Sequence, residues 1–348
     1  MGHDQRIVRR CVSASLCADQ RLLSPLAPTT ARSFRSRATP PAPALVKEVD
    51  NRADGTEHSV PLLKCQVACK VSSTLSSEVG MGAKLKYAPV YFCIGQIQHN
   101  PLLSLESYLP TIQERMRKAG YPGYKRSVQV AFKLNNAESS VPAPSERVDL
   151  YGFSNVPDTA GFVMTSNALS FQTTDYYNYE KFWSELKAGL EVVNESVGGL
   201  SFVDRLGIRY LDAVVPKDGE ALSDYLAPHL LGLPACVPEA SFAYSFSEAL
   251  LVADGGSRVT SRTIIQNGEI GFPPDLQPLG LKVSESLSVA QGEHAIIDTD
   301  ASISERQPFD MSTIETHLDR LHSLASDCFK ASITPHATGA WSGVAEEE

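Results

Sequence analysis

Two aspartates near the C-terminal end of this 348-residue chain have a spacing that could support chemistry. Asp298 and Asp300 are two residues apart in a run that alternates like a β-strand, so both side chains should point to one face of a sheet. Two neighbouring carboxylates can bind a divalent cation or share acid and base roles. A polar strand end before a loop is the simpler interpretation of the pair.

Two histidines follow in a predicted helix, at His317 and His322. Five helical residues turn through about 500°, so the two do not share a face as metal ligands four residues apart would. His322 borders the apolar stripe of that helix, which favours a hydrogen-bonded histidine at the edge of the core. As a third catalytic candidate, His322 would have to enter the same pocket as the two carboxylates.

Two arginines, Arg205 and Arg209, share one face of a predicted strand, with Gly207 between them. Guanidinium groups in this arrangement can bind an anion or the carboxylates of a partner. An ion pair with Asp or Glu on a covering helix is the simpler interpretation.

The elements that position these arginines lie in residues 175–214. Large apolar residues at spacings of three and four predict a helix with one buried face, consisting of Tyr179, Trp183, Leu186, Leu190, Val193 and Val197. Asp175 or Asn178 can cap its start, and Gly198-Gly199 can end it. The strand that follows places Leu206, Ile208 and Tyr210 on the face opposite the arginines.

The remaining pattern predicts an α+β fold with antiparallel sheets and three main helices packed on them. Strand and helix segments do not alternate regularly, as they would in a doubly wound parallel sheet. Two halves split near residue 175 could be related repeats, and this stays open. The predicted elements are a strand at 90–97, a helix at 105–120, strands at 126–134, 147–153, 160–166 and 168–174, a short helical piece near 220–231, a hairpin of 242–246 and 258–266 across Asp254-Gly255-Gly256, strands at 281–290 and 293–300, and a helix at 311–330 capped by Asp310.

Residues 1–80 differ in composition from the rest of the chain. They are rich in Arg, Ser and Pro and hold few residues that could nucleate a core, which favours a disordered extension or a misassigned start, with Met81 as the functional start. An organelle transit peptide is the alternative. We therefore expect a single domain at 81–342 and a short acidic tail at 343–348.

Charge and cysteine usage exclude several classes of protein. The net charge is -9, and residues 1–80 hold 11 Lys/Arg against 7 Asp/Glu, so the acidity lies in the remainder. An acidic body argues against binding to nucleic acid or to an anionic membrane surface, and no run reaches the ~20 apolar residues of a membrane helix. Seven scattered cysteines indicate reduced thiols in a cytoplasmic protein, and Cys65 and Cys69 lack a second ligand pair for zinc. The usual nucleotide-binding, hydrolase and metalloprotease motifs do not occur, so no cofactor or metal is expected.

Several segments in the order in which they occur along the chain carry a resemblance to a known family. The segments are Tyr87–Val90, Leu105–Gly120, Arg205–Leu211, Ile297–Asp300, Leu318–His322, Phe329 and Ile333–Thr334. Together they resemble a sporadically distributed family of uncharacterised prokaryotic proteins. The resemblance covers about residues 84–342 and leaves residues 1–80 outside it. It implies a prokaryotic, cytosolic setting and carries over no reaction.

The sequence therefore favours a non-catalytic binding or interaction module with a protein partner, and Arg205 and Arg209 are its candidate binding residues. The first alternative is an enzyme that uses Asp298 and Asp300, with His322 as a third member. The second alternative is a regulator in a toxin–antitoxin or defence pair, which the sporadic distribution of the resembled family suggests.

Overall fold

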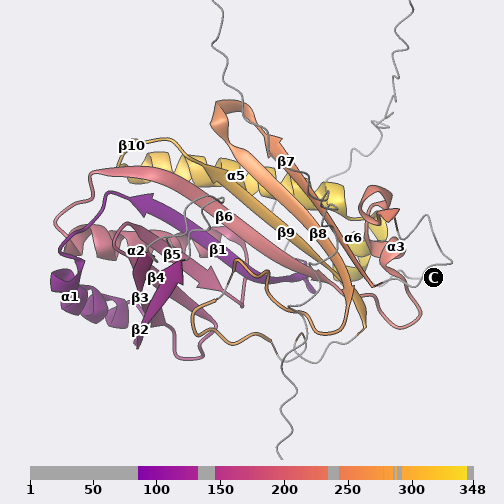
Figure 1. The fold of residues 1–348 in the computed structure, drawn as a ribbon, viewed down its shortest axis with the longest axis horizontal. Coiled ribbons are helices and arrows are strands. Elements are labelled where there is room, and N and C mark those ends of the chain that lie inside the picture. Colours follow the sequence, from indigo (N-terminus) through magenta and orange to yellow (C-terminus); the bar gives the residue numbers. More distant parts are fainter. Residues whose placement is uncertain are drawn as a thin grey trace, which may run out of the picture. The chain divides into compact units, whose positions relative to one another are not determined.

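An antiparallel sheet of ten strands forms the centre of the computed structural model (Figure 1). The model describes residues 85–131, 146–233, 243–276, 278–284, 287 and 292–342, so the predicted extension at 1–80 and the tail at 343–348 lie outside the described residues. The strand order is β2-β3-β4-β5-β1-β6-β9-β8-β7, with β10 beside one end of β6. The strands are β1 (Val90–His99), β2 (Gly123–Ala131), β3 (Glu146–Ser154), β4 (Ala160–Thr165), β5 (Ala168–Thr173), β6 (Phe202–Val214), β7 (Tyr244–Val252), β8 (Arg258–Asn267), β9 (Glu293–Ile303) and β10 (Gln307–Pro308).

The two halves of the sheet share one order of elements. Each half begins with a long strand, β1 or β6, and these two pair with each other in the middle of the sheet. A meander then leads back to pair with that strand, through β5 in the first half and β9 in the second, and a long helix follows. The halves divide between α2 and β6, after Ser196, whereas the sequence suggested a split near residue 175.

The helices pack on one face of this sheet. In Figure 1, α5 lies behind strands β6, β9 and β8. The main core joins the apolar stripes of α2 and α5 to the inner residues of β1, β5 and β6, which confirms the predicted α+β class. No helix in the described ranges combines the length and apolarity needed to cross a membrane. The helices are α1 (Leu105–Lys118), α2 (Tyr179–Ser196), α3 (Leu222–Tyr225), α5 (Met311–Ser332) and α6 (Pro335–Ser342), with 3-10 turns at Pro228–Leu230 and Asp254–Gly256.

Local signals set the ends of the long helices as the sequence predicts. The Asn178 side chain accepts a hydrogen bond from the Lys181 N–H at 3.0 Å, and the Asp310 side chain accepts one from the Thr313 N–H at 2.8 Å. α1 begins at Leu105, as the pattern predicts, and Pro110 therefore lies beyond its first turn. Pro110 cannot donate to the carbonyl of Glu106, and both residues are exposed, where water can replace that bond.

The predicted strand at 281–290 is wrong for the described residues 281–284 and 287, which belong to no strand. Leu281 and Leu287 instead pack against the sheet face opposite α5, where Leu211 and Ile296 lie. Apolar residues in a loop that covers a sheet can thus imitate the pattern of a strand. α6 and the short strand β10 carry no signal that the sequence interpretation recognised.

We expect Gly189→Ala to destabilise the fold although alanine favours helices. A Cβ at this position in α2 would lie 2.1 Å from an aromatic carbon of Phe162 on β4. Overpacking of this kind costs about 1–3 kcal/mol, more than the ~1 kcal/mol gained in helix propensity. Urea denaturation measures the free energy of unfolding, and Glu191→Ala on the exposed side of α2 is the control. An unchanged or higher stability in Gly189→Ala would contradict the close packing of α2 on β4.

Candidate functional site

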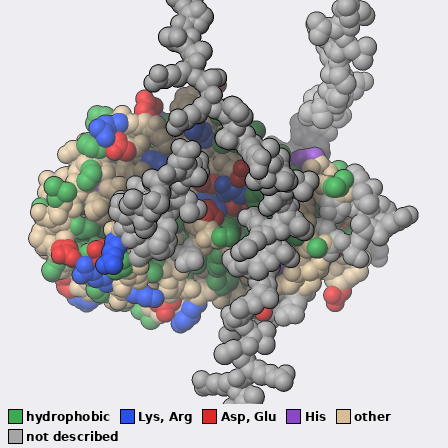
Figure 2. Space-filling model, in the orientation of Figure 1, with side chains coloured by type: hydrophobic (Ala, Val, Ile, Leu, Met, Phe, Trp, Pro, Cys, Tyr) green, Lys and Arg blue, Asp and Glu red, His purple; other side chains and the backbone are tan. Residues whose placement is uncertain are grey.

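The candidate residues divide between the two faces of the sheet. We call the face that packs against α2 and α5 the helix face and the opposite one the open face. The open face carries Arg205, Arg209, Asp298 and Asp300, since directly opposite residues of paired strands share a face and the register pairs Arg209 with Asp300. Figure 2 shows acidic and basic side chains gathered near the middle of this face.

A segment between β8 and β9 crosses the open face. We call its described residues, 268–276, 278–284 and 287, the crossing segment. The Phe272 ring packs edge-on against Phe92 at 5.2 Å, and the Tyr91 hydroxyl donates to the Gly271 carbonyl at 2.7 Å. At the far side, the Lys282 N–H donates to the Asp158 carbonyl at 2.7 Å. The crossing segment therefore covers the apolar part of the open face.

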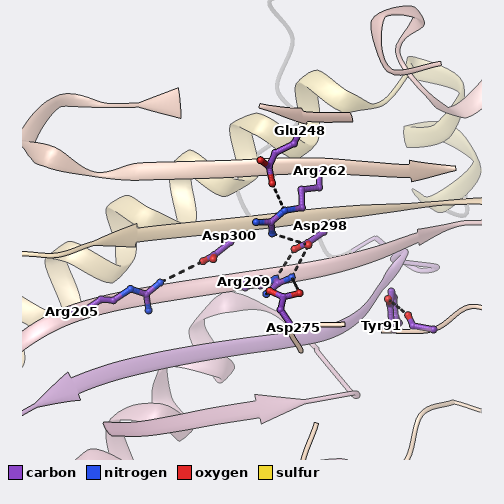
Figure 3. Close-up of polar contacts among 9 residues, drawn as sticks. Tyr91, Arg205, Arg209, Glu248, Arg262, Asp275, Asp298 and Asp300 are labelled. Carbon is purple, nitrogen blue, oxygen red and sulfur yellow. Dashed lines mark hydrogen bonds and ion pairs between the residues drawn. The ribbon is translucent and has the colours of Figure 1, made fainter. Parts of the chain in front are cut away.

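A row of five alternating charges joins the strands to this segment (Figure 3). We call Glu248, Arg262, Asp298, Arg209 and Asp275 the charged row. Arg209 binds both oxygens of Asp298, each at 2.7 Å, and both oxygens of Asp275, at 2.8 and 3.2 Å. Arg262 donates to Asp298 at 3.2 Å and to Glu248 at 2.7 Å. The charged row thus connects β7, β8, β9, β6 and the crossing segment.

Burial makes the pairs of the charged row mutually dependent. The side chain of Asp298 has no exposed surface and that of Arg209 is 10% exposed, so each ion has lost most of its hydration. Burial lowers the pKa of Arg209, but its hydrogen bonds to Asp298 and Asp275 outweigh this and raise the pKa above its ordinary value. The same bonds hold the pKa of Asp275 below its usual range. The arrangement fastens the crossing segment to the sheet and leaves Arg209 few donors for a ligand.

Arg205 is held much more loosely than Arg209. Its guanidinium lies against Gly207, where a Cβ would be 3.0 Å from Nη1. Its polar contacts are a 3.3 Å hydrogen bond to Gln96 and an approach of 4.0 Å to Asp300. The side chains of Arg205 and Asp300 are 28% and 29% exposed, and burial raises the pKa of Asp300. Arg205 is therefore partly exposed and more weakly held than Arg209.

Amide and hydroxyl groups surround this arginine. Gln96 donates to Ser170 at 3.1 Å, and Gln98 donates to Gln96 at 3.4 Å. We call Arg205, Asp300, Gln96, Gln98 and Ser170 the Arg205 patch. Its residues lie on four neighbouring strands, β5, β1, β6 and β9, on the open face. Polar groups in this arrangement can orient a small charged group without surrounding it.

His322 lies on the helix face and does not meet the two aspartates. Its Nδ1 is 2.9 Å from the Tyr210 hydroxyl, and its ring stacks on Tyr179 at 4.1 Å. Burial lowers its pKa. The three catalytic candidates, Asp298, Asp300 and His322, thus do not converge in one pocket, and His322 is a hydrogen-bonded histidine at the edge of the core.

Asp212 is an ionisable residue that the sequence interpretation missed. It lies on β6 two residues after Tyr210, so the period of two places it on the buried helix face. Burial, with a smaller effect of the Asp298 charge, raises its pKa to about 8. The signal was present, because the alternation of Leu206, Ile208 and Tyr210 continues directly to this carboxyl.

The described residues of the two faces do not bring metal ligands together. Within the ranges that the structure describes, no three His, Cys, Asp or Glu side chains are grouped to hold an ion. Asp298 and Asp300 each face an arginine. An arginine in that position supplies the positive charge that a cation would otherwise bring.

No protein-family model and no curated protein matches this chain. The resemblance to the sporadically distributed prokaryotic family stays a prediction. The geometry of the two faces is therefore the basis for assigning a function.

We expect Arg209→Met to destabilise the protein by about 3–5 kcal/mol, because it leaves the buried carboxylate of Asp298 with a weaker partner. The control is Arg306→Met, which removes an exposed pair with Asp204 and should cost at most about 1 kcal/mol. Chemical denaturation of both variants measures the difference. Equal losses would show that the charged row does not stabilise the fold.

We expect Asp212→Asn to stabilise the protein at neutral pH. The folded protein keeps a proton up to about pH 8, whereas the unfolded chain releases it above about pH 4. The stability of the natural protein should therefore fall as the pH rises through this window, by at most about 1.4 kcal/mol per pH unit from this group. Thermal unfolding from pH 5 to pH 8 tests this. The slope should decrease in Asp212→Asn and stay unchanged in Asp204→Asn, whose side chain is exposed and whose pKa is lowered.

Proposed function

We propose that this protein is a non-catalytic binding module that holds an anionic group of a partner at the Arg205 patch. The observation that carries the proposal is the contrast between the arginines of the open face. The N–H groups of Arg209 and Arg262 donate to carboxylates of the same chain, whereas Arg205 makes one long hydrogen bond and is partly exposed.

A carboxylate is the group that the Arg205 patch fits best. A guanidinium fork can bind two oxygens side by side, and the neighbouring amides of Gln96 and Gln98 can donate or accept beside it. Asp300, at 4.0 Å, limits the net positive charge, which disfavours a polyanion such as nucleic acid. We propose an acidic side chain or a chain terminus of a protein partner as the source of the carboxylate, in a cytoplasmic setting that the free thiols of Cys93 and Cys328 support.

The surroundings of the candidate residues support binding more than catalysis. Asp298 accepts three hydrogen bonds from Arg209 and Arg262 and its side chain has no exposed surface, so it is not accessible to a substrate. A small hollow of about 90 Å³ lies at the start of α2, and none of the five candidate residues lines it. Catalytic groups usually converge in such a concave site.

An enzyme that uses Asp300 is the second candidate. The observation in its favour is the raised pKa of this partly exposed carboxyl, a property common among general acids and bases. Turnover of any substrate by the full chain, lost in Asp300→Asn and kept in Asp204→Asn, would support the enzyme and contradict the non-catalytic module.

We expect small dicarboxylates to stabilise the full chain through Arg205. Succinate at ten times its dissociation constant should raise the unfolding temperature by about 3 °C. Arg205→Gln should remove this shift, and Arg306→Gln, an exposed arginine paired with Asp204, should keep it. Differential scanning fluorimetry with a succinate titration gives both values. An equal, saturable shift in the Arg205→Gln variant would overturn the proposed site.

A further inference from the structure

The edge strand β7 exposes a concentration of apolar side chains. Thirteen large hydrophobic residues are exposed in the described part of the chain, and five of them lie in these nine residues. Val252 is 71% and Leu250 60% exposed. Among the described residues, no strand pairs with the outer side of β7. Both backbone groups and apolar surface are therefore open to a further strand at this edge.

The two edges of the sheet differ in how they are protected. β2, at the other end, carries Lys125 and Arg126, which discourage pairing with a further strand. β7 has no Lys, Arg, Pro or Gly and follows β8 in register through nine residues without a bulge. Its single charge, Glu248, is bound by Arg262. A long, regular and apolar edge of this kind pairs readily with another strand.

We propose that β7 pairs with β7 of a second copy of this chain, antiparallel and across a two-fold axis at Ala249. The N–H and C=O groups on the outer side of β7 can form hydrogen bonds with an extended strand, and the side chains of two β7 strands fit each other in this register. Phe246 then lies opposite Val252 of the second copy, an aromatic and β-branched pair that stabilises sheets. Glu248 lies opposite Leu250 of the second copy, so the two glutamates do not face each other.

Two further features favour a second copy over an unrelated strand. On the helix-face side of β7, Ser245, Ser247 and Ala249 are small, and Leu251 would lie opposite Ser247 of the second copy, so no two large side chains meet there. The tip of the β7–β8 hairpin is fixed, because Arg320 of α5 donates to the carbonyl of Asp254. The edge is therefore presented in one position, and joining two of them continues the antiparallel sheet through a closed, isologous interface.

Sedimentation equilibrium of the full chain tests the proposal. We expect a mass twice the 37.7 kDa of the chain, and a return to 37.7 kDa in Ala249→Lys, which places two lysines face to face at the axis. Gln129→Lys on the exposed β2 edge should remain dimeric, and circular dichroism shows that each variant is folded. A monomeric natural protein at about 100 µM, or a folded Ala249→Lys variant that stays dimeric, would overturn the proposal.

Cysteine substitution tests the register independently. Directly opposite residues in an antiparallel pair have Cβ atoms about 4.5–5.5 Å apart, near disulfide distance. Ala249→Cys should therefore form a cross-linked dimer under mild oxidation. Leu251 is exposed on the same face but would lie opposite Ser247 of the second copy. Leu251→Cys should therefore form no more cross-linked dimer than the natural protein does. Equal cross-linking of the two variants on non-reducing gels would contradict the axis at Ala249.

Discussion

The buried carboxylate of Asp298 is the constraint on which the open face depends. A carboxylate without solvent is stable only beside positive charge and hydrogen-bond donors, and Arg209 and Arg262 supply both. Because Arg209 also binds Asp275, the same ion pair holds the crossing segment on the sheet. That segment in turn covers Phe92, Leu211 and Ile296, which would otherwise face water. The ion pair thus acts together with the apolar side chains of the crossing segment to cover the second face of a sheet whose helices lie on the other.

The difference between Arg209 and Arg205, the proposed binding residue, arises because the crossing segment covers only Arg209. Arg205 and Arg209 are four residues apart on β6, share a face and each lie near a carboxylate on β9. Asp275 of the crossing segment reaches Arg209, whereas Arg205 has only Gln96 and the more distant Asp300. The strand pattern makes the two arginines equivalent, and the path of a loop separated from them by more than sixty residues distinguishes them.

Sequence reasoning succeeded where the cause is local and failed where it is not. The stripe of Trp183, the caps at Asn178 and Asp310 and the alternation after Arg205 follow from spacing and nearby hydrogen bonds, and the structure contains each of them. The partner of Arg209 was expected on a covering helix. Asp298 instead lies 89 residues away on a neighbouring strand, and the spacing of residues along the chain does not indicate the order of strands in a sheet. The pattern at 281–290 was misjudged at the described residues 281–284 and 287, because apolar residues that cover a sheet can imitate the pattern of a strand. Asp212 could have been found, since it continues the buried face of Tyr210.

The shared order of elements in the two halves determines which strands lie at the edges of the sheet. Each meander leads away from the central pair β1 and β6, so β2 and β7 become the edges, and β8 separates β7 from Asp300, the nearest member of the Arg205 patch. Pairing through β7 would leave that patch uncovered. In an antiparallel pair, opposite residues share a face, so the open faces of both copies would point to the same side of one continuous sheet. Two Arg205 patches on one surface would engage a partner with two acidic groups at a high effective concentration, which turns a weak single contact into firm binding.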